Sequence, residues 1–545
     1  TDPEAVSVAA LILSAIQDKN PRVSLDDIYS ALCQSRSESH LDPLSILPHV
    51  LQSRQPAAKS IISLIGECGS SKEIVIAVQE SLERIADDLA LEPDEDEIEH
   101  ESASDQLISL ILLCSSGMSY ASLFPTGEIR VAIPRLKLRK KSPETIRTLL
   151  SQLESTVHLA GPHLSRVQGR EIIGSVSQLV LNILSWTGDS NAEDAATCQD
   201  MLKRLLDSTI SDCSHCIQSS LAQRSFETLY PRLIIRSRVM LGWEGGEEVI
   251  NDASTAYVSC GRTFADESLP PSPTVAYLVL ISHSKTLPSD INQLLSFMLP
   301  ILVASIQTTH ALDEALSLLL RSLHVSHFPV GQQLSPDIAG TLCALLPSLA
   351  SGHPDEDIRH QAFRILSQTL SLMPPELRIQ ILKDLTTDTQ YPQMRAASVG
   401  LVKEALLDAL SRENAPNIFA SPIFLQVFGP VLLRPEPVDL FHSELSLSDI
   451  EDSPEPSRLV ECLSLYYILL LRDKSNQTGI RDRDQISNVE RTLLGPLRST
   501  LLRWTDDPAA SHEHMHAIMP LVSLKTSLER VDSAIANLRL QSLPV

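Results

Sequence analysis

Apolar residues recur at spacings of three and four along most of the chain, a period that predicts amphipathic helices. One clear example follows Ser-Ser-Lys-Glu at 70–73, a capping box that predicts a helix start. Its apolar stripe consists of Ile74, Val78, Leu82, Ile85 and Leu89. Charged residues lie off this stripe, so one face of the expected helix is buried and the other is solvated.

The same pattern recurs after residue 141. Ser142-Pro143-Glu144 places a proline at the first helical position, and Gly161 supplies a stop. The stripe between them consists of Ile146, Leu149, Leu150, Leu153 and Val157. Only residues 127–133 alternate with the period of two that predicts a strand, so we expect a small insertion at 127–141 in a helical body.

Residues 335–411 predict two successive helical hairpins. Four helix starts follow Ser335, Pro354, Pro374 and Tyr391. The expected core consists of Ala362, Ile365, Leu366 and Leu370 on the second helix and Ala396, Val399, Leu401, Val402 and Leu406 on the fourth. Pro336 and Pro375 are 39 residues apart and Arg359 and Arg395 are 36 apart, close to the ~40-residue period of HEAT repeats. We therefore predict an all-α, irregular HEAT/ARM-like α-solenoid of stacked helical hairpins.

Charge and turn composition divide the chain further. Residues 92–101 carry too many like charges to fold against a core, and residues 435–457 are rich in Pro, Ser and Asp. The expected segments are an N-terminal helical region at 1–91, an acidic linker at 92–103, central helical repeats at 104–334, a HEAT-like repeat pair at 335–434, a mobile acidic Pro/Ser loop at 435–457, and C-terminal helices at 458–545. The mobile loop is a candidate for phosphorylation, although a solvated surface loop has the same composition.

Composition supports a folded, helical chain. Its 545 residues exceed the roughly 250–300 that one core supports, and 43% hydrophobic residues exclude wholesale disorder. Aromatic residues are only 4%, so Leu, Ile, Val and Ala make the core. The net charge of −24 argues against nucleic acid or anionic membrane as a partner and favours a basic protein surface. Solubility explains the charge equally well.

Nine cysteines are scattered through apolar helical stretches, which predicts reduced, buried thiols. No secretory signal is expected at the N-terminus. The long uncharged run between Asp290 and Asp313 is interrupted by polar residues and Pro300, so we expect no transmembrane helix. Together these features predict a cytoplasmic protein, with the nucleus as a further compartment.

Two patterns carry candidate metal chemistry. Cys213-Ser-His-Cys216 lacks a second ligand pair for zinc, because Cys198 stands alone, so structural thiols are favoured over a metal- or thiol-dependent redox site. His512 and His516 share a helical face but no carboxylate follows at ligand spacing, and we expect a polar helix start. We therefore predict no metal and no cofactor.

Two further clusters remain open or structural. The basic run at 135–141 fits a nuclear-import signal, a contact for the acidic linker, or a solvated loop. Gly242-Trp-Glu-Gly245-Gly246 lacks the lysine and the strand of a phosphate-binding loop, so a turn between helices is expected. No set of catalytic residues stands in a recognisable frame, and we predict that the chain is not an enzyme.

Three segments carry a family resemblance: Ile-Arg-His-Gln-Ala-Phe-Arg-Ile-Leu at 358–366, Leu-Lys-Asp-Leu at 382–385, and Tyr-Pro-Gln-Met-Arg-Ala-Ala-Ser-Val-Gly-Leu-Val-Lys at 391–403. This region resembles the signature of the glomulin and fungal Yap-binding protein family, which also includes a plant lateral-root protein. The Arg-Ala-Ala part is shared with HEAT repeats in general.

The resemblance implies a non-catalytic, HEAT-like binding protein. Members in animals and plants cap the RING subunit of cullin-RING ubiquitin ligases, and fungal members are partners of an oxidative-stress transcription factor of the bZIP class or kinetochore-associated. Either role implies a protein that occludes a partner surface. The alternative is a generic α-solenoid scaffold or a transport or assembly adaptor.

Three basic residues are candidates for partner contact. Arg359 and Arg395 occupy equivalent positions in adjacent repeats, and Lys403 follows two turns after Arg395. In register, such charges would form a ladder along one surface. The competing interpretation is structural, with Arg359 paired to Asp355 or Asp357.

Overall fold

The chain is described by a computed structural model in which helix follows helix along the sequence. It describes residues 3–18, 21–35, 40–69, 71–90, 97–116, 142–187, 192–234, 238–261, 269–324, 332–388, 390–411, 417–438, 440–441, 453–505 and 515–541. These ranges contain helices and no strand, which confirms the predicted all-α class. The chain divides into two compact units, Thr1–Ser322 and Leu323–Val545.

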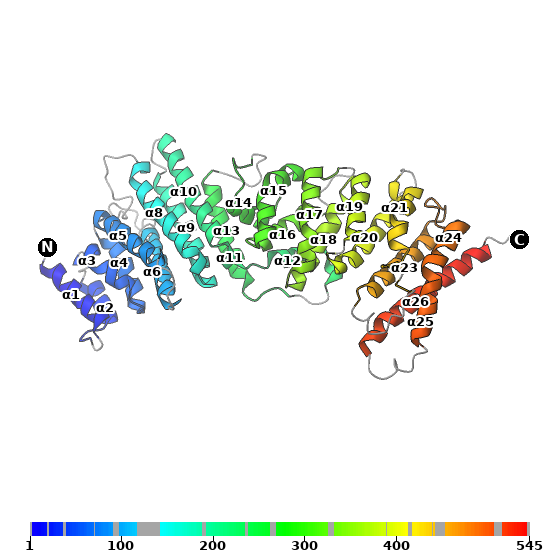
Figure 1. The fold of residues 1–545 in the computed structure, drawn as a ribbon. Coiled ribbons are helices and arrows are strands. Elements are labelled where there is room, and N and C mark those ends of the chain that lie inside the picture. Colours follow the sequence, from blue (N-terminus) through cyan, green and yellow to red (C-terminus); the bar gives the residue numbers. More distant parts are fainter. Residues whose placement is uncertain are drawn as a thin grey trace. The chain divides into compact units, whose positions relative to one another are not determined.

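The N-terminal unit is a succession of helices labelled in Figure 1. They are α1 (Pro3–Gln17), α2 (Leu25–Ser35), α3 (Pro43–Leu51), α4 (Pro56–Cys68), α5 (Ser71–Ala90), α6 (Glu97–Ser116), α8 (Ser142–Ala160), α9 (Arg166–Thr187), α10 (Ala192–Asp212), α11 (Ser214–Ile217), α12 (Leu221–Leu229), α13 (Trp243–Ser259), α14 (Val275–His283), α15 (Ile291–Thr308) and α16 (Leu312–Ser322). Helices near in sequence contact each other, for example α8 with α10 and α9 with α13.

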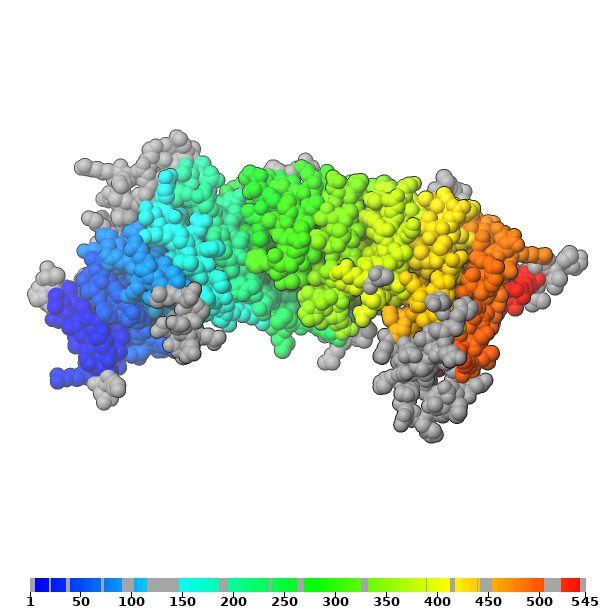
Figure 2. All heavy atoms as spheres, in the orientation of Figure 1, coloured from blue at the N-terminus to red at the C-terminus, as the bar shows by residue number. Residues whose placement is uncertain are grey.

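The C-terminal unit follows the same plan. Its helices are α17 (Pro336–Gly352), α18 (Glu356–Ser371), α19 (Pro375–Thr387), α20 (Pro392–Ser411), α21 (Pro422–Leu432), α23 (Glu455–Arg472), α24 (Arg483–Val489), a π-helical turn η7 (Glu490–Leu494), α25 (Gly495–Thr505) and α26 (Met515–Gln541). Contacts join α17 to α18, α19 to α20, α20 to α23 and α23 to α26. Within each unit the colours of Figure 2 succeed one another in chain order, as expected when each helix lies against its sequence neighbours.

Prolines and capping side chains set where the helices begin. Proline stands at the first helical positions of α17, α19 and α21, among others, where its missing N–H costs nothing. Elsewhere a side chain caps the first turn, as the Thr274 hydroxyl does by accepting a bond from the amide of Tyr277. The four helix starts predicted in 335–411 are all observed.

The predicted apolar stripes form the core. Every residue of the 74–89 stripe is at most 4% exposed, and in α8 the stripe from Leu149 to Val157 is buried. The helix stops at Ala160, one residue before Gly161. On α20 the prediction was wrong for Ala396, which is half-buried, whereas Met394 is buried. The cap residue Ser70 and the side chain of Ile146 lie outside the described residues.

One helix in the described ranges, α15, is long and apolar enough by length and composition to cross a membrane. Its residues Ile291, Leu294, Leu295, Met298, Leu302, Ser305 and Ile306 are buried. It contacts α14 and α16, and Pro300 lies within it. Such a segment is weak evidence for a membrane span, because the core helix of a helical repeat has the same composition.

Two predicted linkers are partly helical. The acidic stretch continues into α6, which begins at Glu97, so the linker prediction is wrong from that residue on. An acidic first turn suits the positive end of a helix dipole. The predicted mobile loop ends early, because α23 begins at Glu455 and both Glu455 and Pro456 are buried. The proposed insertion at 127–141, with its basic run, and the loop residues 442–452 lie outside the described residues.

Candidate functional site

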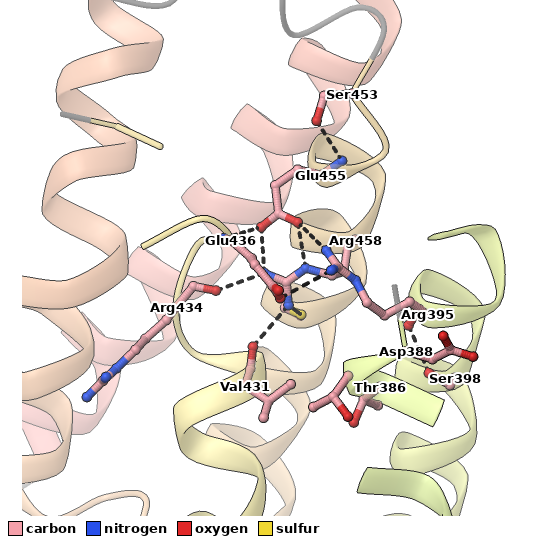
Figure 3. A network of polar contacts seen from close by, with 12 residues as sticks. Thr386, Asp388, Arg395, Ser398, Val431, Arg434, Glu436, Ser453, Glu455 and Arg458 are labelled. Carbon is pink, nitrogen blue, oxygen red and sulfur yellow. Dashed lines mark hydrogen bonds and ion pairs between the residues drawn. The ribbon is translucent and has the colours of Figure 1, made fainter. Parts of the chain in front are cut away.

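A buried ion network joins three segments of the C-terminal unit around Glu455, the first residue of α23 (Figure 3). Its other charged members are Arg395 on α20, Glu436 in the turn after α21, and Arg458 one turn along α23. We call these four residues the Glu455 network. The side chains of Arg395, Glu455 and Arg458 are 10%, 3% and 2% exposed, so their charges are removed from solvent.

Arg458 is the most fully bonded member of the Glu455 network. It donates from Nε and Nη2 to the two carboxylate oxygens of Glu455, at 2.7 and 2.5 Å. It also donates to the carbonyls of Val431 and Arg434, at 3.1 and 2.8 Å. Burial opposes its charge, but the hydrogen bonds to Glu455 outweigh it and hold the pKa of Arg458 above the ordinary value. The guanidinium therefore fixes α23 to the end of α21.

Arg395 connects α20 to the same carboxylate. Its Nη2 lies 3.0 Å from a Glu455 oxygen and its Nη1 lies 3.2 Å from Glu436. The backbone amide of Glu436 donates to the other Glu455 oxygen at 2.9 Å. Two arginines and two glutamates thus balance in charge, and a buried ionic cluster is tolerated only when it is paired in this way.

Lys403 repeats the connection between α20 and α23 nearer the surface. Its Nζ lies 3.4 Å from Glu461, and the two side chains are 26% and 42% exposed. Because such a pair is half-solvated, it contributes roughly 0–1 kcal/mol to stability. Of the two candidate basic residues on α20, Lys403 is the one whose charged group reaches the solvent-accessible face formed by α20 and α23.

Arg359 is bonded within its own turn. Its Nη1 donates to the carbonyls of His353 and Pro354 at 2.7 and 2.9 Å, whereas Asp355 caps the helix through the amide of Asp357. Arg395 and Lys403 both face α23, but Arg359 bonds to the loop before α18. The contacts therefore bring two of the three candidates to one helix pair.

Sequence reasoning missed Glu455, Arg458 and Glu436, all of which it assigned to a mobile loop or to its edge. The signal was present in Pro-Glu-Pro-Ser-Arg at 454–458. Proline followed by an acid is a helix-start pattern, and Glu455 and Arg458 have the spacing of one helical turn. Ser453 completes the start, since its hydroxyl accepts a bond from the amide of Glu455 at 3.2 Å.

An open cleft of about 690 Å³ lies beside the Glu455 network, where the first residues of α20 and α23 meet the end of α17. Its lining is uncharged and mixes polar with apolar side chains: Ser351, Gln390, Tyr391, Pro392, Gln393, Ala396, Ser453, Pro454 and Ser457. Such a surface offers hydrogen bonds and an aromatic ring. The hydroxyl and amide groups among its described lining residues are suited to hydrogen bonding with a bound partner.

Cys213 lies between α10 and α11 in the N-terminal unit, Cys216 lies within α11, and both residues are almost fully buried. Burial raises the pKa of Cys216 to about 11 and that of Cys213 still more clearly. A thiol that stays protonated is a poor nucleophile and metal ligand. The geometry therefore favours structural thiols. None of the nine cysteines, all of which lie in the described ranges, forms a disulfide, but the prediction that they are buried is wrong for Cys33 and Cys68, which are exposed, and Cys114 is only half-buried.

The sequence suggested that the glycine cluster at 242–246 is a turn between helices. In the structure it forms the start of α13 instead. Gly242 caps the helix with a φ of 75°, a left-handed conformation that favours glycine. A side chain at Gly246 would lie 2.1 Å from the Ile217 carbonyl oxygen. Arg170 bonds the carbonyls of Ile217 and Gly242, so this close approach fixes α9, α11 and α13 together.

Metal chemistry has no support in the described ranges, which contain no group of three or more His, Cys, Asp or Glu side chains able to hold an ion. The side chains of His512, His514 and His516 lie outside them; α26 begins at Met515.

Comparisons with known proteins give one family. Residues 261–527 match a family described as "Uncharacterised protein family, YAP/Alf4/glomulin", under the name Kinetochor_Ybp2. No curated protein matches the chain. Among solved structures, an engineered protein from the Northeast Structural Genomics Consortium is 11% identical, with 97% of this chain and 98% of that chain covered. Its TM-score of 0.25 is too low to carry an argument.

Proposed function

We propose that this chain, a member of the YAP/Alf4/glomulin family through residues 261–527, is a non-catalytic regulator that binds a partner protein and excludes a competitor from it. Family membership supports protein binding in general. The observation that carries the proposal further is the α20–α23 face, which lies inside the matched region. There the Glu455 network holds two helices in fixed register and leaves Lys403 at the surface.

A rigid helical face suits inhibition by steric exclusion. Helices of successive repeats present an extended surface, and a partner held there is covered over one face. Because the helices are already fixed by buried ion pairs, little ordering entropy is lost on binding. No covalent step is needed for such a protein to compete with a second ligand of its partner.

Two partner classes follow from the family. The first is the RING subunit of a cullin-RING ubiquitin ligase, capped so that the ubiquitin-conjugating enzyme is excluded. The second is a bZIP transcription factor of the oxidative-stress response, or a kinetochore component. We further propose a cytoplasmic location, extending to the nucleus; nine cysteines that form no disulfide in the described residues support a reducing compartment.

The test is affinity purification of the tagged full-length chain from cells of its source, beside the Lys403→Glu variant, with bound proteins identified by mass spectrometry. We expect a cullin with its RING subunit, or a bZIP factor, to be recovered with the native chain and lost with the variant. Recovery of transport or assembly factors alone would instead favour a generic scaffold.

Two control variants separate contact from structure. Lys383→Glu makes the same charge change at an exposed residue of α19 and should leave recovery unchanged. The double swap Lys403→Glu/Glu461→Lys restores the local ion pair with reversed polarity. If the swap restores the partner, Lys403 acts only through α23; if the partner stays lost, the Lys403 charge itself faces the partner.

A further inference from the structure

A second cleft in the C-terminal unit carries charge, unlike the uncharged cleft beside the Glu455 network. It encloses about 280 Å³ and is lined by Arg434, Pro435, Val438, Phe441, Arg491, Thr492 and Pro496. One wall is the segment that follows α21, and the other is the π-helical turn η7 with the start of α25. We call it the two-arginine cleft.

The walls are fixed to each other and to the Glu455 network. The hydroxyl of Thr492 lies 3.4 Å from the carbonyl of Leu433, which joins η7 to the end of α21. The Arg434 carbonyl accepts a bond from Arg458, while its side chain points away from the network (Figure 3). A π-helical turn is rare and is found frequently at functional sites, because it displaces side chains from the regular helical register.

Among the residues that the structure describes, no acid pairs with the two arginines of the two-arginine cleft. Among the described residues, no hydrogen bond or ion pair is found for the Arg434 guanidinium, and Arg491 bonds only the neutral amide of Asn488, at 3.2 Å. The nearest acids in sequence are engaged elsewhere. Glu436 pairs with Arg395, and both oxygens of Glu490 pair with Arg498. A local positive site thus stands in a chain of net charge −24.

Apolar surface lies next to this charge. Val438 is 69% exposed, although it is a large aliphatic residue, and Phe441 and two prolines complete the apolar part. The volume is slightly below the ~300–1,000 Å³ of pockets that bury a small organic molecule. It suits one or two side chains of an extended segment.

We propose that the two-arginine cleft docks an acidic segment of a partner protein that carries one aliphatic side chain among its carboxylates. The aliphatic group enters against Pro435, Val438 and Phe441, and flanking carboxylates pair with Arg434 and Arg491. Guanidinium groups favour this role, since their fixed fork of donors matches a carboxylate. The inference rests on the proposed protein-binding function but adds a site separate from Lys403.

The experiment uses the full chain and fluorescein-labelled peptides of nine residues, measured by fluorescence anisotropy at one ionic strength near 0.15 M. One peptide has a central leucine between runs of acidic residues, a second replaces the leucine with serine, and a third replaces the acids with lysine. At this salt the Debye length is about 8 Å, so the peptide's attraction to the arginines of the cleft is stronger than its repulsion by distant acidic groups of the chain.

We expect the leucine peptide to bind at least tenfold more tightly than the serine peptide and the lysine peptide not to bind. Arg434→Gln/Arg491→Gln should weaken binding of the leucine peptide at least tenfold, and Val438→Ser should weaken it about fivefold. Arg503→Gln, at an exposed arginine of α25 outside the cleft, is the matched control and should change nothing. Circular dichroism checks that all variants fold.

Three outcomes overturn the inference: no peptide binds, the serine peptide binds equally well, or the double variant binds as the native chain does. A fourth variant changes Leu445, Leu447 and Ile450 to serine. If the leucine peptide binds only to this variant, the chain's own acidic Pro/Ser loop at 435–457 occupies the cleft, and this result also overturns the inference. If the peptide assay fails while the Lys403-dependent partner is recovered from cells, the proposed function stands without this site.

Discussion

Glu455→Gln isolates the energetic contribution of the buried charge at the centre of the Glu455 network. Glutamine has nearly the same shape but no charge, so Arg395 and Arg458 keep only Glu436 as a counter-ion, and that side chain is 45% exposed. Removing one partner of a buried ion pair costs about 3–5 kcal/mol, because the remaining charge stays desolvated. This is a large part of the roughly 5–15 kcal/mol that holds a domain folded.

Hydrogen exchange followed by mass spectrometry measures this effect in the C-terminal unit alone. Peptides from α20 and α23 report the free energy of opening of those helices. Since each 1.4 kcal/mol is a factor of ten, we expect their protection to fall about a hundredfold to several-thousandfold. Peptides from the N-terminal unit should be unaffected and serve as an internal reference.

Glu461→Gln is the matched control, because it removes the partner of Lys403 from the same helix at a half-solvated position. Its expected cost is about 0–1 kcal/mol. If Glu455→Gln costs no more than this control, burial does not strengthen the network and the assumption of a fixed α20–α23 register is wrong.

Three further predictions concern the N-terminal unit. Burial, and secondarily the charge of Asp313, raise the pKa of Glu314 from 4.5 to about 8. The contribution of Glu314 to folding stability is therefore complete below pH 4.5 and is lost as the pH rises through 8. Glu314→Gln should abolish this loss of stability, which thermal unfolding between pH 5 and 9 measures. Gly246→Ala should lower the free energy of unfolding in urea by about 1–3 kcal/mol, because the new methyl group meets a backbone carbonyl. Gly174→Ala, where nothing lies within 4 Å of the new methyl group, should raise it by about 0.5–1 kcal/mol. In the native chain a thiol reagent should modify the exposed Cys33 rapidly and Cys216 only after unfolding; rapid labelling of Cys216 would contradict its burial.

The local sequence pattern was sufficient to predict the helices and which face of each helix is buried. Stripes of period 3.6, such as 74–89, and prolines at 336, 375 and 392 act within one or two turns, so their effect is readable without knowing the neighbours. The same locality explains the family resemblance at 358–403, because a repeat is defined by its own short motif. The predictions at 97–101 and 455–457 were wrong because an acidic helix start and an acidic linker have the same composition.

The sequence by itself determined an all-α chain of helical hairpins and placed Lys403 and Arg395 on one helix. Only the tertiary structure decided which charges are buried. Arg395 and Glu455 are 60 positions apart, and nothing in either local pattern shows that they meet at 3.0 Å. Likewise the two-arginine cleft joins the segment after α21 to a π-helical turn some fifty residues later. Contacts between distant segments depend on how helices stack, and the apolar stripe that drives stacking does not specify which polar side chains are brought together.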